Sequence, residues 1–534
     1  MESLDEQEME RYHYLRAHPV RINMVPNSRL LSCGLFTAYQ AASLEDYRCR
    51  FGDILSEMEL AAVDGFSEES AKALSPFVAF DSRTRPGSLP DTVPSSSSTF
   101  AARGALRKKQ GGRPVEEKYG FKCNSLVKDR INLSFGGSRS YEDRKGFPSV
   151  LTGNVTYYGT GKLDKLVMGD YNARFGQGLA LWSGLSLSSY CEPENFLRRP
   201  SGISPVNSFT GTGSLRGIAA DFSYGKWILS PFVKIDDGRI SPGVNAMFLF
   251  HDGQFSLLSL NDGSHFGTLS GNFAFNIGGS DFFSELAYDF PNRRSNGIAG
   301  CVIHLNDNCK GAVLARYLEG KMHSVTGSLS FVSKKREHLK GKSGFGSSVA
   351  RHKGSLSLDA EYLPKKKTGE NRVPMQYGLF ARHFFQASQT FSLEMRAVEK
   401  IRTHQKSGFR TDLRIDAKYS NGNWLANARA NSVLGRKEGL LSYVEGGHKG
   451  KAMSVYVRGC LYRIDDWDDR IYVYERDAPG TFNVPAYYGR GFSISVFAGF
   501  KAVLGKVRSS FYLRSSLKNK PGAAELKIQC VFDL

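Results

Sequence analysis

The side chains of this chain that could do chemistry do not fall into a catalytic arrangement. Gly344-Phe-Gly-Ser-Ser348 lacks the spacing of a nucleophile elbow, and Gly341-Lys342-Ser343 has Arg336 where a phosphate-binding Walker loop needs its first glycine. Gly211-Thr-Gly213-Ser-Leu-Arg-Gly217 misses the dinucleotide-binding spacing by one residue. The 11 histidines form no HExxH motif and the 8 cysteines form no CxxC pair. We therefore expect no enzyme, no cofactor and no small-molecule substrate.

One acidic run could hold a hard cation. Asp465-Asp466-Trp467-Asp468-Asp469 places four carboxylates within five residues, and carboxylate oxygens are the ligands that such cations prefer. A run of this kind is more often a solvated loop, and we expect no metal site.

Two glycine turns leave one chemical option, the binding of phosphate. The first is Gly34-Leu35-Phe36 and the second is Gly65-Phe66-Ser67, each between two stretches with a helical pattern. Backbone N–H groups at a helix N-terminus bind phosphate well, and glycine lets them approach because it has no Cβ. The candidate nucleic-acid-binding residues are therefore Gly34, Leu35, Gly65, Phe66 and Ser67.

Most of the chain, by contrast, reads as one strand after another. In Thr411–Tyr419, Leu413, Ile415, Ala417 and Tyr419 alternate with charged residues, and the same period of two recurs to the C-terminus. Many strands that are wet on one face and apolar on the other need a closed sheet. The pattern predicts a mainly β fold, a large antiparallel transmembrane β-barrel of roughly 18–24 strands, with a polar lumen and an apolar outside.

Four parts follow along the chain. Residues 1–18 form an acidic helical lead, residues 19–80 a small all-α domain, residues 81–98 a Pro- and Ser-rich flexible linker, and residues 99–534 the barrel. The last strand, Glu525–Leu534, has the apolar alternation that barrel closure needs. Residues 191–213 interrupt the strands, and we expect them to fold into the lumen or over one mouth, with a plain surface loop as the alternative.

The charge is unevenly placed. The formal net charge is +19, but residues 1–80 carry 7 Lys/Arg against 13 Asp/Glu. Nucleic-acid binding is driven mainly by basic residues that neutralise phosphates, so the acidic balance weighs against DNA as a ligand. The other reading is a small module that docks to a protein partner or beneath the barrel.

The helical domain resembles the paired helix-hairpin-helix unit of competence-type DNA-binding proteins. That resemblance rests on the duplicated helix, glycine turn and helix, with Pro19–Asn23 as entry segment and Leu74–Ala79 as exit. The family's turns are glycine-hydrophobic-glycine, and here Phe36 and Ser67 stand where the second glycines should be. The resemblance implies DNA contact through the turns, and these departures weaken it.

Two further segments resemble signatures of Gram-negative outer-membrane barrels with an N-terminal helix-hairpin-helix domain. They are Met168–Gly184, which contains Gly-Asp-Tyr and Arg-Phe-Gly-Gln-Gly-Leu, and Arg470–Gly491. The resemblance implies location in the cell outer membrane, among lipid and lipopolysaccharide, with residues 1–98 periplasmic, and it implies no biochemical activity. A signal peptide is not visible in this sequence.

The sequence thus favours a non-enzymatic, porin-like barrel that acts as an envelope pore or as an assembly or scaffold component with an envelope protein partner. The alternative is a DNA-binding or DNA-uptake protein that uses the helical module. Inward basic residues such as Arg414 and Lys418 would favour anionic solutes, whereas a plugged lumen would favour a scaffold. The transported solute, the strand count and the state of the lumen stay open at this point.

Overall fold

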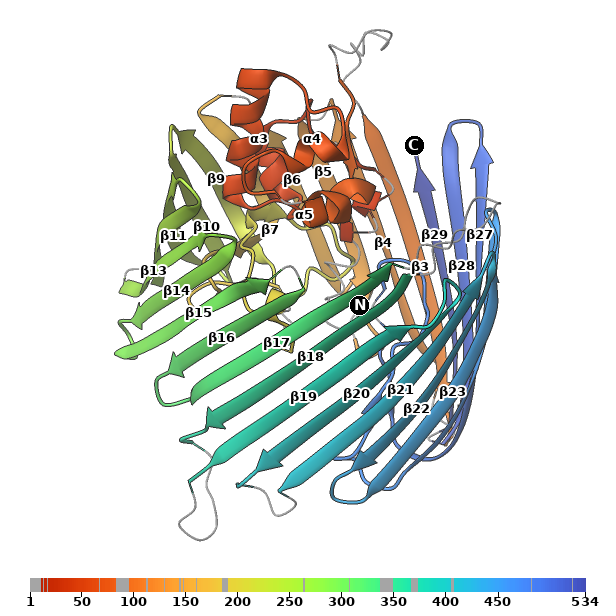
Figure 1. Cartoon of the computed structure of the whole chain (residues 1–534). Coiled ribbons are helices and arrows are strands. Elements are labelled where there is room, and N and C mark those ends of the chain that lie inside the picture. The colour runs from red at the N-terminus through yellow and green to blue at the C-terminus, as the bar shows by residue number, and fades with distance from the viewer. Residues whose placement is uncertain are drawn as a thin grey trace.

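The computed structural model describes residues 11–82 and 96–534, apart from residues 13, 17, 67, 112–113, 129, 144–145, 147, 160, 185–190, 263–264, 307, 337–348, 366–372, 405–407, 482 and 521. A small helical unit precedes a single closed barrel (Figure 1). The predicted linker falls mostly on residues 83–95, which lie outside the described residues.

The helical unit is built from two helix pairs. Its elements are β1 (Val20–Arg21), α2 (Asn27–Ser32), α3 (Ala38–Phe51), α4 (Glu57–Ala61), α5 (Glu68–Leu74), η1 (Ser75–Phe77) and β2 (Val78–Ala79). Thr37 and Gln40 form a capping box that starts α3, and Ser56 caps α4 by accepting from the Glu59 N–H. β1 pairs in parallel with β2, so the entry and exit segments of the unit lie side by side.

Twenty-four antiparallel strands close the barrel within the described residues. Its last strand pairs with its first, from Ala523 opposite Lys109 to Asp533 opposite Thr99. The fold therefore confirms the predicted class, at the upper end of the expected strand range. The strands are β3 (Ser97–Lys109), β4 (Glu116–Val127), β5 (Ile131–Arg139), β6 (Val150–Tyr158), β7 (Leu163–Arg174), β9 (Leu215–Tyr224), β10 (Trp227–Asp236), β11 (Arg239–Phe250), β12 (Gly253–Asp262), β13 (His265–Ile277), β14 (Ser280–Asp289), β15 (Arg294–Asn306), β16 (Cys309–Leu318), β17 (Met322–Arg336), β18 (Val349–Tyr362), β19 (Met375–Gln386), β20 (Phe391–Arg402), β21 (Phe409–Asn421), β22 (Trp424–Leu434), β23 (Glu438–Lys449), β24 (Met453–Ile464), β27 (Gly489–Leu504), β28 (Val507–Asn519) and β29 (Gly522–Asp533).

The wall of the barrel is apolar outside and polar inside. On β21 the outward Leu413 and Ile415 are 46% and 48% exposed, while the inward Asp416 is 3% exposed. The same alternation recurs on the opposite side of the ring, where Ile131, Leu133 and Phe135 of β5 are exposed and Asn132 and Ser134 are buried. The period of two that marks the strands in sequence is therefore the contrast between the two faces of the wall.

The two mouths of the barrel differ. At the first, here called the terminal mouth, β3 begins and β29 ends, and the described connections are short turns such as Gly225–Lys226 and His251–Asp252. From the far mouth, two long connections turn inward, namely residues 175–214 and residues 465–488. Within them lie η2 (Pro193–Asn195), β8 (Gly202–Pro205), β25 (Ile471–Tyr472) and β26 (Ala486–Tyr487).

The helical unit sits in the terminal mouth and contacts the wall (Figure 1). His18 lies 3.8 Å from Asp533 at the end of β29, and Tyr39 Oη donates to Asp252 Oδ1 at 3.1 Å in the β11–β12 turn. In this structure the unit is thus seated against the barrel, which agrees with the reading of the sequence in which the module docks beneath the barrel.

Candidate functional site

The two glycine turns that are candidates for nucleic-acid binding lie close together in the helical unit. Phe36 of the first turn packs edge-on against Phe66 of the second, with ring centroids 6.1 Å apart. Gln40 Nε2 donates to the Gly65 carbonyl at 2.8 Å and ties α3 to the second turn. Ser67 lies outside the described residues.

The first turn is covered rather than open to a ligand. Leu35 and Phe36 are 6% and 3% exposed and belong to the core of the unit. A Cβ at Gly34 would lie 2.5 Å from Nη1 of Arg11, so the Arg11 guanidinium lies directly over the turn. Cys33, just before it, is buried, and burial raises the pKa of its thiol to about 11.

A buried lysine joins the helical unit to the wall. Lys165 of β7 stands opposite Asp221 of β9, and its Nζ lies 2.7 Å from Asp221 Oδ2. The same Nζ donates to Ser32 Oγ of α2 at 2.9 Å and to the carbonyl of Ile203 in β8. Lys165 has no exposed surface. Three separate parts of the chain therefore meet at one ammonium group, which nothing in its strand pattern distinguishes from a solvated lysine.

The first inward connection is held by a carboxylate from the wall. Glu285 of β14 accepts the backbone N–H groups of Gln177 at 2.6 Å, Leu179 at 3.1 Å and Ala180 at 3.2 Å. The Ser270 hydroxyl donates to it as well, at 2.7 Å. This contact accounts for the Gly-Gln-Gly part of the first signature, which supplies a backbone turn that binds a carboxylate of the protein itself.

Gly176 shows why glycine is needed in that turn. Its φ is +57°, and a Cβ there would lie 2.7 Å from Glu285 Oε2. Any side chain would therefore be strained in its backbone and would push the carboxylate away from the N–H groups.

The rest of the first connection lies along the inner wall. Phe196 is fully buried in a cluster with Phe283, Ile298 and Leu314, and Ser328 of β17 donates to the Cys191 carbonyl at 3.1 Å. β8 pairs with the C-terminal end of β7, from Tyr171 to Arg174. The prediction that residues 191–213 fold inward is confirmed for the described residues.

Glu192 attaches this connection to the wall at a further place. Its carboxylate pairs with Lys353 Nζ at 3.1 Å and with the Arg382 guanidinium. Burial alone would raise the pKa of Glu192, but the charges of Lys353 and Arg382 outweigh it, so the pKa lies below its usual value of 4.5.

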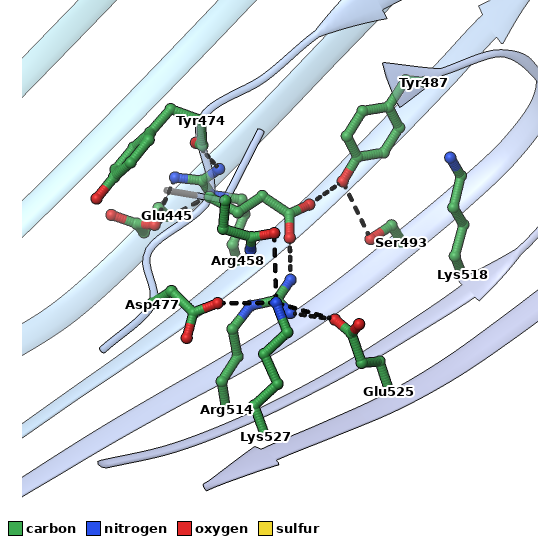
Figure 2. A network of polar contacts seen from close by, with 12 residues as sticks. Glu445, Arg458, Tyr474, Asp477, Tyr487, Ser493, Arg514, Lys518, Glu525 and Lys527 are labelled. Atoms are coloured by element: carbon green, nitrogen blue, oxygen red, sulfur yellow. Dashed lines mark hydrogen bonds and ion pairs between the residues drawn. The ribbon is translucent and has the colours of Figure 1, made fainter. Parts of the chain in front are cut away.

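The second inward connection is fixed by a network of buried ion pairs (Figure 2). Arg514 of β28 lies between Glu475 of the connection and Glu525 of β29, with the second pair at 2.8 Å. Both Arg514 and Glu475 are 3% exposed. Lys527 pairs with Asp477 at 2.9 Å and so adds a second tie from β29.

A fourth carboxylate extends this network toward β23. Glu445 lies 2.7 Å from Arg458 of β24 and 3.0 Å from Arg476 of the connection, and Arg458 also donates to the Tyr474 carbonyl at 2.7 Å (Figure 2). Opposite charges thus neutralise one another between wall and connection. The network orients the inward segment, and every carboxylate in it has a basic partner.

The luminal residues named from the sequence have different surroundings. Arg414 pairs with Asp416 and lies 3.8 Å from Glu394, and Asp416 also pairs with Arg429 at 2.6 Å. Lys418 is exposed. At this part of the wall the predicted positive surface is therefore largely neutralised by carboxylates that its alternation pattern already contained.

The acidic run at 465–469 is also paired with basic residues. Asp465 accepts from Arg490 Nε at 2.6 Å, and Asp466 and Asp468 each lie 3.7 Å from Arg436. Asp469 accepts the Lys437 N–H at 2.7 Å. No group of three or more His, Cys, Asp or Glu side chains in the described part of the chain is arranged to hold a metal ion.

Among the described residues, no helix is both long enough and apolar enough to cross a membrane. No protein-family model matches the chain, and no curated protein matches it either. Among solved structures, it is similar to three barrels from Pseudomonas aeruginosa. OccK10 (OpdN) is 10% identical, with 82% of this chain and 99% of that one covered and a TM-score of 0.31. OccK3 (OpdO) is 11% identical, with 83% and 97% covered and a TM-score of 0.29. OpdQ is 7% identical, with 82% and 97% covered and a TM-score of 0.31. Scores this low carry no argument about function, so the function is argued below from the contacts of this chain.

Proposed function

We propose that this chain is a non-enzymatic outer-membrane barrel whose lumen is occupied by its own helical unit and inward connections, and that it serves as an assembly or scaffold component of a Gram-negative envelope. The observation that carries the proposal is the contact of Lys165 with Asp221, Ser32 and the Ile203 carbonyl. It joins the wall, the helical unit and the first inward connection at a fully buried charge.

The membrane location rests on the two faces of the wall. Outward apolar side chains such as Leu440, Val444 and Leu461 are more than half exposed, which would be unfavourable for a protein surrounded by water. In a bilayer the same side chains contact lipid, and a closed sheet leaves no strand edge without partners. Lipid and lipopolysaccharide are accordingly the surroundings that we assign to the outer face.

The terminal mouth is proposed to face the periplasm. Outer-membrane barrels have short periplasmic turns and longer extracellular loops, and the described turns at the terminal mouth are short while both inward connections start from the far mouth. The helical unit would then lie on the periplasmic side, within reach of an envelope protein partner.

A scaffold is favoured over an open pore because three separate elements enter the interior and each is fixed by buried charges. A mobile plug would not need Glu285, Arg514 and Lys165 all to have hydrogen-bond or ion-pair partners at the same time. DNA capture gains no support from the geometry, because the turn at Gly34 is covered by Arg11 and the unit is acidic.

The test is single-channel conductance in a planar bilayer, preceded by membrane fractionation and heat-modifiable gel mobility. We expect the full chain to fractionate with membranes, to shift on heating and to stay closed. Lys165→Met leaves Asp221 buried and unpaired, so it should loosen the unit and give frequent openings. Lys162→Met, in the exposed turn nearby, is the matched control. A full chain that conducts steadily like an open porin would refute the scaffold role.

A further inference from the structure

A cavity of about 860 Å³ lies between the helical unit, the wall and the first inward connection. The helical unit contributes α2 and the segment before β1, and the wall contributes β3 to β7, β23 and β27 to β29. Residues 204–209 of the first inward connection and residues 479–480 of the second complete the lining. The proposed scaffold role does not use this space.

The lining is strongly basic. The helical unit supplies Arg11, Arg16 and Arg29 to it, and no Asp or Glu among the described residues of that unit lines it. The unit therefore presents a basic face to the interior although its overall charge is negative.

Five further basic residues come from the barrel. They are Lys122, Arg174, Lys449, Lys501 and Arg508. Among the described residues of the lining, eight are basic and one, Asp533, is a carboxylate, which lies 3.8 Å from His18 and accepts from Thr99. This excess contrasts with the network around Arg514, where the acids and bases are matched.

The excess of basic residues in the described lining favours an anion as the ligand of this cavity. Gathering like charges in a partly enclosed space costs free energy unless counter-charge enters it. Arg11 Nε is buried and has no hydrogen-bond partner among the described residues, so they leave at least one donor of the cluster open to a ligand.

Part of the lining is apolar. Tyr14, Leu15, Leu126, Tyr158 and Phe209 all face the same space. A small inorganic anion would leave this surface in water, whereas an anion that carries an apolar group would cover it.

We propose that this cavity binds a phosphate monoester that bears an apolar group. Arginine guanidinium groups match phosphate oxygens in pairs, and a dianionic phosphate suits a surplus of positive charge better than a single carboxylate. A lipid headgroup and a free organic phosphate share this chemistry.

The experiment is isothermal titration of the full chain in a neutral detergent. The probes are hexyl phosphate for the free compound, dihexanoyl phosphatidic acid for the lipid, and hexanol as the uncharged control. Residues 1–10 carry five acidic side chains next to Arg11 in the sequence, so a chain lacking residues 2–10 is titrated as well to remove competing carboxylates. Both phosphates should bind, more weakly at high salt. Binding should also weaken from pH 7.5 to pH 5, because a phosphate monoester gains its second proton at about pH 6.

Variants assign the binding to this cavity. Lys501→Gln with Arg508→Gln should weaken phosphate binding about tenfold or more, since each substitution removes a charge-assisted contact. Lys506→Gln, in the β27–β28 turn outside the lining, should leave it unchanged. Heat-modifiable mobility shows that each variant is folded, and Lys449→Gln gives a second test from another strand. Tighter binding of phosphatidic acid identifies the lipid source, and equal binding the free phosphate. Hexanol binding as well as hexyl phosphate, or folded variants with unchanged affinity, would overturn the proposal.

Discussion

The carboxylate of Glu285 accepts the backbone N–H of Gln177 at 2.6 Å across 108 residues of sequence. The wall of the barrel thereby fixes a turn of the connection that enters it. The carboxylate takes the place of water as the acceptor of three backbone N–H groups. The first signature of the chain is thus an internal attachment point.

Glu285→Gln should weaken this attachment. The amide keeps one oxygen but places an NH₂ group near the N–H donors of Gln177, Leu179 and Ala180, which costs about 1–3 kcal/mol for a lost charged acceptor. We expect a lower midpoint temperature of the gel-mobility shift and faster tryptic cleavage after Arg198. Glu438→Gln, at an exposed position, is the control and should change neither.

Gly176→Ala should destabilise the barrel more than Gly422→Ala does. The two glycines have nearly the same φ, +57° and +55°, but a Cβ at Gly422 meets no atom within 4 Å, whereas one at Gly176 lies against Glu285. The backbone strain of about 1 kcal/mol is common to both, so the difference in midpoint temperature measures the cost of the close approach. Equal shifts in the two variants would refute the role given to Gly176.

Arg514→Leu should be far more damaging than Arg490→Leu. The first leaves Glu475 buried without its charge partner, for which about 3–5 kcal/mol is expected. The second removes a pair whose arginine is 62% exposed, and such pairs contribute about 0–1 kcal/mol. Urea titration of the heat-modifiable band compares the two, and similar midpoints would contradict the network of Figure 2.

Acid should release the first inward connection. The pKa of Glu192 in the folded chain lies below its ordinary 4.5, because Lys353 and Arg382 outweigh the effect of burial. Its stabilising contribution is therefore complete above that ordinary value and is lost as the pH falls through the lowered pKa. Hydrogen exchange of residues 191–200 should increase only below about pH 4.5. Glu192→Gln should remove that pH dependence, and an unchanged acid response in this variant would assign the release to another group.

The helical unit should bind duplex DNA no more tightly than the non-specific range, about 10⁻⁴–10⁻⁶ M at physiological salt. Fluorescence anisotropy of the full chain with labelled duplex measures this. Adding the absent glycine by Phe36→Gly would remove a core side chain that is 3% exposed, so Ser67→Gly is the informative variant. Submicromolar, salt-sensitive binding by the unaltered chain would make DNA capture the leading hypothesis.

The strands and their closure followed from the sequence because the period of two reports which face of a wall is wet. The partners of the inward polar residues did not. Lys165, Glu285 and Arg514 occupy ordinary polar positions of their strands, and their contacts come from segments far away in the sequence. The sequence did not decide between docking of the helical unit beneath the barrel and docking to a protein partner, since a net charge does not reveal that Arg11, Arg16 and Arg29 share one face.

The pairing of β29 with β3 also closes the ring. Ser98 and Leu534 exchange backbone hydrogen bonds of 3.1 and 2.8 Å, so the two ends of the barrel sequence form its final joint. Until that joint forms, both edge strands carry backbone groups without partners and could pair with other chains. His18 of the helical unit lies beside Asp533 at this joint. The strand pairing that closes the ring and a contact that seats the helical unit therefore lie at the same joint.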